Sequence, residues 1–295
     1  MAINIQTLKT RSVTAAVFVA VMLTGLLYNL WSFLLLFSIV HIGCWIEYLK
    51  IVEKIYTIKI DPVNKWVFAI CGFIMMVVFG LQINSTESGA ALWEASFSSD
   101  LLFLLVVMAC PFIFISRNKQ MTAHIRWACM AGFLYLSLPF TCLLNLRDSF
   151  VPAAEFDLID HGKIYACVII FSIWINDTMA YIVGSMIGKT PFSKISPKKT
   201  WEGTIGGALL CIVVIGLSAT LIPVTKSIAW YHWVSIAAIC AVFGTLGDLL
   251  ESKLKRIAGI KDSGTIMPGH GGFLDRFDSL LIATPFVWLY IKLFL

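Results

Sequence analysis

The chain has 295 residues, of which 59% are hydrophobic and only 13% charged, with a net charge of +5 and a mean hydropathy of +0.87. Soluble chains carry about 25% charged residues, so this chain has too few charges for a surface that faces water. The composition excludes an ordinary globular protein, a disordered chain and a nucleic-acid-binding domain, and it predicts a protein that crosses a membrane several times.

Apolar runs separated by polar breaks predict nine membrane-spanning helices, because runs this long must satisfy their backbone groups internally. The first two runs are so close at Asn29 that we expect a hairpin with a two-residue turn. The predicted spans are 13–28, 30–46, 66–82, 101–115, 127–144, 164–187, 205–222, 230–250 and 274–295. We therefore expect an all-α polytopic membrane protein, with five spans in residues 1–163 and a catalytic transmembrane region in residues 164–295.

The distribution of Lys and Arg predicts the orientation. With the N-terminus in the cytoplasm, eighteen of the 22 basic residues lie in cytoplasmic segments. The cytoplasmic segment 47–65 mixes charged and apolar residues at helical spacing, which favours an interfacial amphipathic helix. We expect a multi-pass protein of a bacterial inner membrane, with anionic lipid head groups near its basic face.

Four acids lie within or at the ends of predicted spans, where an ionisable residue is a functional hypothesis by default. They are Asp177, Asp248, Asp275 and Asp278. Oxygen ligands without matching His or Cys favour Mg²⁺, which binds through a few carboxylates and substrate phosphates. The alternative is that these acids only pair with Arg276, Lys255 or Arg256.

Basic and glycine-rich segments lie beside these acids in the chain. Ser196, Lys198, Lys199 and Thr200 precede a predicted helix start, and helix N-termini bind phosphate. Residues 268–272 (PGHGG) form a loop whose backbone N–H groups could approach phosphate oxygens. Together they predict a metal and polyphosphate site, although a lysine pair beside a span is also a common determinant of topology.

Two further residues have two readings each. Glu47 ends the second predicted span, either as a helix-terminal acid or as a contributor to the site. His270 either donates to phosphate or fixes its loop. The eight cysteines lie in apolar runs without metal-binding spacing, which is typical of small buried residues.

The C-terminal region resembles the phosphatidate cytidylyltransferases. The matching residues are Ser252-Lys253-Leu254-Lys255-Arg256, Lys261-Asp262, Pro268-Gly269-His270-Gly271-Gly272 and Asp275-Arg276-x-Asp278. Upstream, Asp177-x-x-Ala180-Tyr181-x-x-Gly184, Gly188-Lys189 and Ser196-Pro197-Lys198-Lys199-Thr200-x-Glu202-Gly203 are similar to the same family. The resemblance covers residues 164–295, and the first five spans resemble the family only in hydrophobicity and length.

The resemblance implies that CTP and phosphatidate react to give CDP-diacylglycerol and diphosphate. It implies that Asp248 and Asp275 bind Mg²⁺, with Asp278, Lys255 and His270 also catalytic. The implied substrate contacts are Asp177, Ser196, Lys198, Lys199, Thr200, Glu202, Arg256, Lys261, Gly271, Gly272 and Arg276. The sequence leaves open whether a monovalent cation joins the metal and whether the protein is a homodimer in the bilayer.

Other functions fit less well. A CDP-alcohol phosphotransferase or a polyprenyl transferase would carry acidic motifs that are absent here, whereas a CTP-dependent polyprenol kinase would hold the same nucleotide against a lipid. A transporter or channel would place charged residues at mid-bilayer in several helices, but the first five spans are almost free of them.

Overall fold

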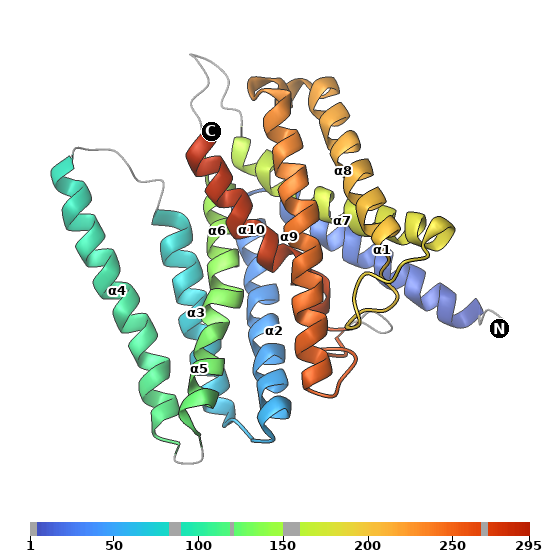
Figure 1. Cartoon of the computed structure of the whole chain (residues 1–295). Coiled ribbons are helices and arrows are strands. Elements are labelled where there is room, and N and C mark those ends of the chain that lie inside the picture. Colours follow the sequence, from blue (N-terminus) through green and yellow to red (C-terminus); the bar gives the residue numbers. More distant parts are fainter. Residues whose placement is uncertain (1–4, 83–89, 119–120, 150–159, 267–270) are drawn as a thin grey trace. The chain divides into compact units, whose positions relative to one another are not determined.

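A computed structural model describes residues 5–82, 90–118, 121–149, 160–266 and 271–295 (Figure 1). Ten α-helices, one π-helical turn and one 3-10 turn account for most of these residues, and no strand occurs among them. Within the described ranges, an isolated bridge between Pro191 and Thr200 is the nearest approach to a sheet. The prediction of an all-α polytopic membrane protein is confirmed.

Seven described helices are long and apolar enough to span a membrane. They correspond to seven of the nine predicted spans. The first and fourth predicted spans coincide with two shorter apolar helical segments, Val13–Leu27 and Leu102–Ser116. The predicted spans therefore lie at the right places, because these two segments belong to the longer helices Ile5–Leu27 and Ala90–Ser116.

The chain forms two compact units, and the division differs from the predicted boundary at residue 163. The first unit contains residues 1–148 together with 262–274, and the second contains 149–261 together with 275–295. The segment 262–274 packs with the first unit, and its backbone and Ser263 bind Glu47 there, as described below.

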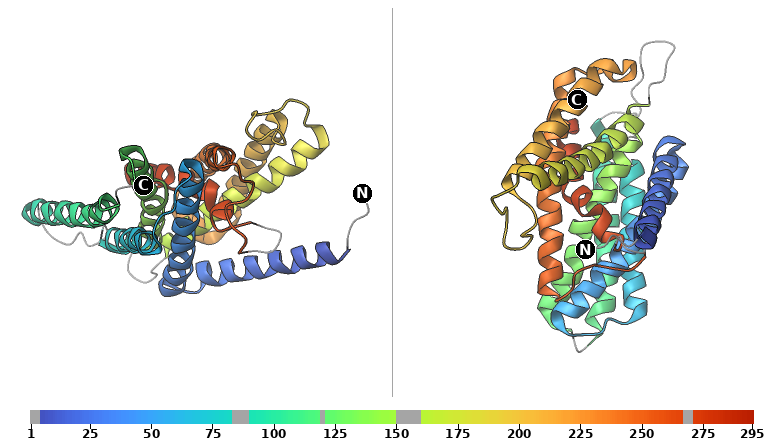
Figure 2. Two further views of the ribbon diagram at one scale, coloured as in Figure 1. Left: turned by 90° about the horizontal axis from the view of Figure 1, so that it is seen from below. Right: turned by 90° about the vertical axis from the view of Figure 1, so that its right-hand side faces the viewer.

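The helices of the first unit are α1 (Ile5–Leu27), α2 (Leu30–Tyr56), α3 (Pro62–Gln82), α4 (Ala90–Ser116), α5 (Ala123–Gly132), η1 (Phe133–Ser137) and α6 (Leu138–Arg147). The predicted two-residue turn is present, because α1 ends at Leu27 and α2 begins at Leu30, and the Asn29 side chain accepts a 2.7 Å hydrogen bond from the Ser32 N–H. This is a capping interaction that fixes where a helix begins. Figure 2 shows α1 leaving α2 at a steep angle.

The segment 47–65 does not form a separate interfacial helix, so that prediction was wrong. Residues 47–56 continue α2, which ends only at Thr57, whose φ is +54°. No Gly or Pro interrupts this stretch, and Tyr48, Leu49 and Ile51 are buried on it. Apolar burial therefore favours one long helix over a break at residue 47.

The predicted fifth span is a single helical column made of α5, η1 and α6. Its π-helical turn places Ser137 against α2, where the Ser137 hydroxyl lies 3.1 Å from His41 Nε2 and 3.0 Å from Trp45 Nε1. Trp45 also packs against Phe68 and Phe133. This aromatic cluster is the core of the first unit.

The helices of the second unit are α7 (His161–Ile187), α8 (Trp201–Leu221), η2 (Pro223–Ser227), α9 (Trp230–Ile257) and α10 (Leu274–Phe294), of which Leu274 belongs to the first unit. Helices α7 and α8 run side by side (Figure 2). A Cβ at Gly207 would lie 2.7 Å from Ala180 N and 2.8 Å from Asn176 O. Glycine at 207 thus permits the close approach of these two helices.

Candidate functional site

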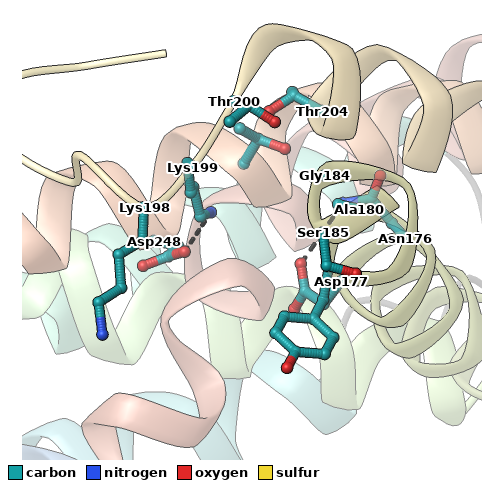
Figure 3. Close-up of a pocket in the computed structure, with 12 residues that line it drawn as sticks. Asn176, Asp177, Ala180, Gly184, Ser185, Lys198, Lys199, Thr200, Thr204 and Asp248 are labelled. Atoms are coloured by element: carbon teal, nitrogen blue, oxygen red, sulfur yellow. Dashed lines mark hydrogen bonds and ion pairs between the residues drawn. The ribbon is translucent and has the colours of Figure 1, made fainter. Parts of the chain in front are cut away.

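The second unit contains a cavity of about 390 Å³, open on one side, at the end of α7 that leads into α8 (Figure 3). Three helices and one loop contribute polar side chains to it. Its lining comprises Asn176, Asp177, Ala180, Tyr181, Gly184 and Ser185 of α7, Lys198, Lys199 and Thr200 of the loop, Thr204 of α8, and Thr245 and Asp248 of α9. The cavity therefore brings together both polar stretches of the C-terminal half of the sequence.

The lysines are presented by the loop 188–200 between α7 and α8. Backbone hydrogen bonds close the base of this loop, from Trp201 N to Thr190 O at 2.9 Å and from Phe192 N to Lys199 O at 2.8 Å. The carbonyl of Ser196 accepts from Lys199 N at 3.0 Å, which makes a turn at its tip. Ser196 thus shapes the turn that carries the lysines.

Glu202, in the first turn of α8, holds the other end of the same loop. Its carboxylate accepts from Thr190 Oγ at 2.8 Å and from the backbone N–H groups of Lys189 and Thr190 at 3.2 Å. The Thr200 hydroxyl caps α8 by accepting from Gly203 N at 3.1 Å. These contacts make Glu202 a support of the basic loop.

The two lysines of the loop differ in their surroundings. The Lys199 ammonium forms an ion pair with Asp248 of α9, and each side chain is 27% exposed (Figure 3). Lys198 is exposed at the mouth of the cavity. Asp177 of α7 lies on the cavity wall, so two acids and two bases share one space.

Three acids gather where α9 and α10 approach. Asp248, Glu251 and Asp278 each place one carboxylate oxygen within 4.8 Å of the others. The approach depends on Gly247, because a Cβ there would lie 3.1 Å from Asp278 C and from Ser279 Cα. Ser252 also donates to Asp248 at 3.3 Å, and Ser279 N donates to Asp278 at 2.6 Å.

Lys255 lies between two carboxylates of this region. It forms ion pairs with Glu251, one turn away on α9, and with Asp275 of α10 at 2.6 Å. Glu251 is fully buried, and among the described residues the Lys255 ammonium is the partner of its carboxylate. A buried carboxylate with so few hydrogen bonds is costly unless further positive charge is present.

Other sequence-predicted site residues lie outside these clusters. Arg256, Lys261 and Arg276 are exposed, and Arg256 Nη1 donates to the carbonyl of Ile260 at 3.4 Å. Gly271 and Gly272 belong to the first unit, where Gly272 lies against Glu47. His270, predicted to be catalytic, lies outside the described residues.

The structure adds residues that the sequence reasoning missed. Glu251 is the most important, since it joins Asp248 and Asp278 in the acidic cluster. Its position three residues after Asp248 and four before Lys255 was a usable signal, because both spacings place side chains on one face of a helix. Asn176, Tyr181, Thr204 and Thr245 also line the cavity.

Comparison with known proteins gives a consistent result. Residues 9–294 match the sequence profile of the cytidylyltransferase family. The chain is 33% identical to a phosphatidate cytidylyltransferase of Staphylococcus saprophyticus over 207 residues, which cover 70% of this chain and 74% of that protein. A protein of the same name from Staphylococcus aureus is 34% identical over 207 residues, with the same coverage. The Bacillus subtilis protein of that name is 45% identical over 133 residues, or 44% of this chain and 47% of its own length.

Proposed function

Because the chain belongs to the cytidylyltransferase family and is thus a membrane-bound nucleotidyltransferase, we propose that it makes CDP-diacylglycerol and diphosphate from CTP and phosphatidate. The names of its relatives support this choice of substrates. The observation that carries the proposal is the cavity itself, where Lys198, Lys199, Asp177 and Asp248 of three chain segments share one polar space within a membrane protein.

In the proposed reaction, a phosphate oxygen of phosphatidate attacks the α-phosphorus of CTP. A new P–O bond forms as the bond between the α-phosphorus and the bridging oxygen of the β-phosphate breaks. Diphosphate leaves with that electron pair. Phosphoryl and nucleotidyl transfers of this kind need positioning and charge neutralisation more than a covalent nucleophile.

The chain's bases suit the binding of polyphosphate. Lys198 is exposed at the cavity mouth and is available to an incoming phosphate group. Lys199 already faces Asp248, so it is held at a fixed place on the cavity wall. The N-terminus of α8, capped by Thr200, adds a positive helix-dipole end beside them.

The acidic cluster fits a divalent cation. Asp248, Glu251 and Asp278 offer only oxygen ligands, which Mg²⁺ prefers, and Glu251 is fully buried among them. Asp275 was also expected as a ligand. It lies beside this cluster and would influence it through Lys255, its ion-pair partner. When bound, Mg²⁺ would neutralise charge on the phosphates and the leaving diphosphate.

We propose further that this site faces the cytoplasm of a bacterial inner membrane, with the N-terminus on the same side. The distribution of Lys and Arg supports this orientation. Both the loop 188–200 and the end of α9 are basic, as cytoplasmic segments are expected to be.

The test is transfer of label from CTP to lipid by the purified protein in detergent micelles that contain phosphatidate. We expect α-phosphate label to enter the lipid and diphosphate to be released, with loss of activity on chelation of Mg²⁺ and recovery when Mg²⁺ is restored. Entry of γ-phosphate label alone would instead identify a CTP-dependent lipid kinase. Absence of any nucleotide chemistry would contradict the proposed function.

A further inference from the structure

Glu47 is a buried acid of α2, 4% exposed, whose charge is not matched by an ion pair among the described residues. Three hydrogen bonds to its carboxylate compensate instead. Ser263 Oγ donates to Oε2 at 2.7 Å, Phe273 N to Oε1 at 3.0 Å and Leu274 N to Oε2 at 2.9 Å. Hydrogen bonds to a charged acceptor are the strong class in proteins.

The three donors lie at the two ends of the segment 262–274, which leads into α10. Gly264 and Gly272 lie against the same carboxylate, and a Cβ at either position would overlap it. A Cβ at Gly264 would also lie 3.2 Å from Gly272 Cα. The ends of the segment therefore meet on one side chain, supplied by a helix more than two hundred residues earlier.

The contact with Leu274 has a specific meaning, because Leu274 is the first residue of α10. The first N–H groups of a helix have no partner within it, and a carboxylate there satisfies them and favours the helix dipole. Phe273, directly before the helix, has no side-chain oxygen with which to cap it. Glu47 takes over this role from outside the helix.

The start of α10 determines the places of two acids. Asp275 is the second residue of the helix and forms the ion pair with Lys255, and Asp278 lies one turn on, in the acidic cluster. If the chain shifted by one residue along the helix, every following side chain would rotate by about 100° about the helix axis. If instead the helix simply began one residue later, its first residue would no longer be helical. Correct presentation of both acids thus requires a fixed start.

We propose that Glu47 is a positioning residue for the cation site: it caps α10 and fixes the residue at which the helix carrying Asp275 and Asp278 begins. The inference rests on the proposed function, since it gives Glu47 its purpose through the divalent cation. Glu47 touches neither substrate nor cation in this role. It acts through the backbone of Phe273 and Leu274.

The test uses the full-length purified protein in detergent and a Glu47→Gln variant, with Mn²⁺ binding followed by electron paramagnetic resonance. The amide keeps the shape of the side chain, but it is neutral and its NH₂ cannot accept the N–H groups. We expect a rise of at least fivefold in the Mn²⁺ dissociation constant. We also expect hydrogen exchange at Phe273 and Leu274 to be at least tenfold faster.

Glu53→Gln is the matched control, the same substitution on the same helix. Glu53 accepts from Ile60 N at 2.7 Å and pairs with Lys65 at 2.7 Å, so it loses comparable contacts away from α10. We expect its Mn²⁺ affinity to stay within twofold of wild type. An equal loss in both variants would mean general destabilisation and would overturn the inference.

Gly264→Ala keeps Glu47, but the added Cβ displaces the Glu47 carboxylate. This variant therefore tests the role of Glu47 if Glu47→Gln does not fold. We expect the same loss of Mn²⁺ affinity. If either variant folds and binds Mn²⁺ with the affinity of the wild-type protein, the inference is overturned. It is also overturned if the wild-type protein transfers nucleotide but binds no Mn²⁺. A wild-type protein that binds Mn²⁺, shows these shifts and transfers no nucleotide contradicts the proposed function and leaves the role of Glu47 standing.

Discussion

Glu251 shows how one side chain depends on its neighbours. It is buried, it pairs with Lys255, and it shares the acidic cluster with Asp248 and Asp278. Lys255, which is shared with Asp275, and Lys199, which pairs with Asp248, are two positive charges beside the four acids of this region. Under the proposed function, a divalent cation supplies the missing positive charge.

We expect Glu251→Gln to lower nucleotide transfer by at least about 10–100-fold, because even residues that only orient metal ligands have effects of this size when replaced. The amide fits the same space but removes the charge that attracts the cation. The measurement is the rate of α-label transfer as a function of Mg²⁺ concentration, which should also shift to a higher requirement.

Asp160→Asn is the control for this substitution. Asp160 caps α7 by accepting from Lys163 N at 2.8 Å, and Asn caps helices about as well as Asp. We expect wild-type activity and Mg²⁺ dependence. A Glu251→Gln protein with both properties unchanged would remove Glu251 from the site.

Replacement of the two lysines of the loop 188–200 should have different effects on stability and on the KM for CTP. Replacement of Lys199 by Gln leaves Asp248 without its ion-pair partner, so it should lower the unfolding free energy by about 1 kcal/mol as well as weaken CTP binding. Replacement of Lys198, which is exposed, should raise the KM for CTP and leave the Tm unchanged. The check is a Tm and a KM for each variant, and equal Tm losses would contradict the distinction.

At the scale of single residues, part of the site could be predicted from the sequence. The acids Asp177 and Asp248 were found because ionisable residues are rare in spans, and the lysine pair was found because it precedes a helix start that suits phosphate. Glu251 was missed although its spacing places it on one helix face with Asp248 and Lys255, and only the approach of Asp278 on α10 is a contact that no local pattern encodes. Glu47 was left with two readings for the same reason, since its partners lie more than two hundred residues away.

Among the helices, the pair α7 and α8 matters most to the cavity, because both line it and Gly207 lets them touch. Small residues at such contacts are typical of helix packing within membranes. The backbone at Asn176 and Ala180 is the surface against which Gly207 packs. Any added volume at 207 must therefore move the wall of the cavity.

We expect Gly207→Ala to lower stability by about 1–3 kcal/mol, as overpacking does in tight interiors, and to reduce activity with it. Gly216→Ala on the same helix is the control, because its Cβ would meet only the Val234 side chain, at 3.0 Å. Thermal unfolding in detergent measures both. A Gly207→Ala protein as stable as the Gly216→Ala protein would contradict this account of the helix contact.

Element positions were predictable to a large extent, because long apolar runs determine where membrane helices lie. The two-residue turn at Asn29 was predicted correctly. The continuation of α2 through residues 47–56 was not, because burial of Tyr48 and Leu49 is a tertiary effect. The π-helical turn at 133–137 likewise reflects packing around Ser137 and carries no sequence signature.

For the whole molecule, the distribution of basic residues predicts that the loop 188–200 faces the cytoplasm and that η2 faces the other side. We expect a membrane-impermeant maleimide added to intact bacterial cells to label Lys226→Cys and not Lys198→Cys, in a background without the eight native cysteines. A permeant maleimide should label both. Labelling of Lys198→Cys from outside would reverse the proposed orientation.

The division into two units could not be predicted from hydropathy alone. A boundary at residue 163 follows the polar segment between spans, whereas the compact units assign 262–274 to the first of them. That assignment depends on hydrogen bonds to one buried carboxylate, and hydropathy patterns do not encode which distant helix a loop will join.

Gly247 has a consequence for the choice of ion. Because residue 247 has no side chain, main-chain atoms of α10 can come up against α9 there. Side chains can rotate to suit ions of different radius, but two backbones in contact cannot move apart without repacking both helices. Discrimination between a small ion such as Mg²⁺ and a larger one such as Ca²⁺ would then rest on a steric limit in the main chain, and the carboxylates alone would not set it.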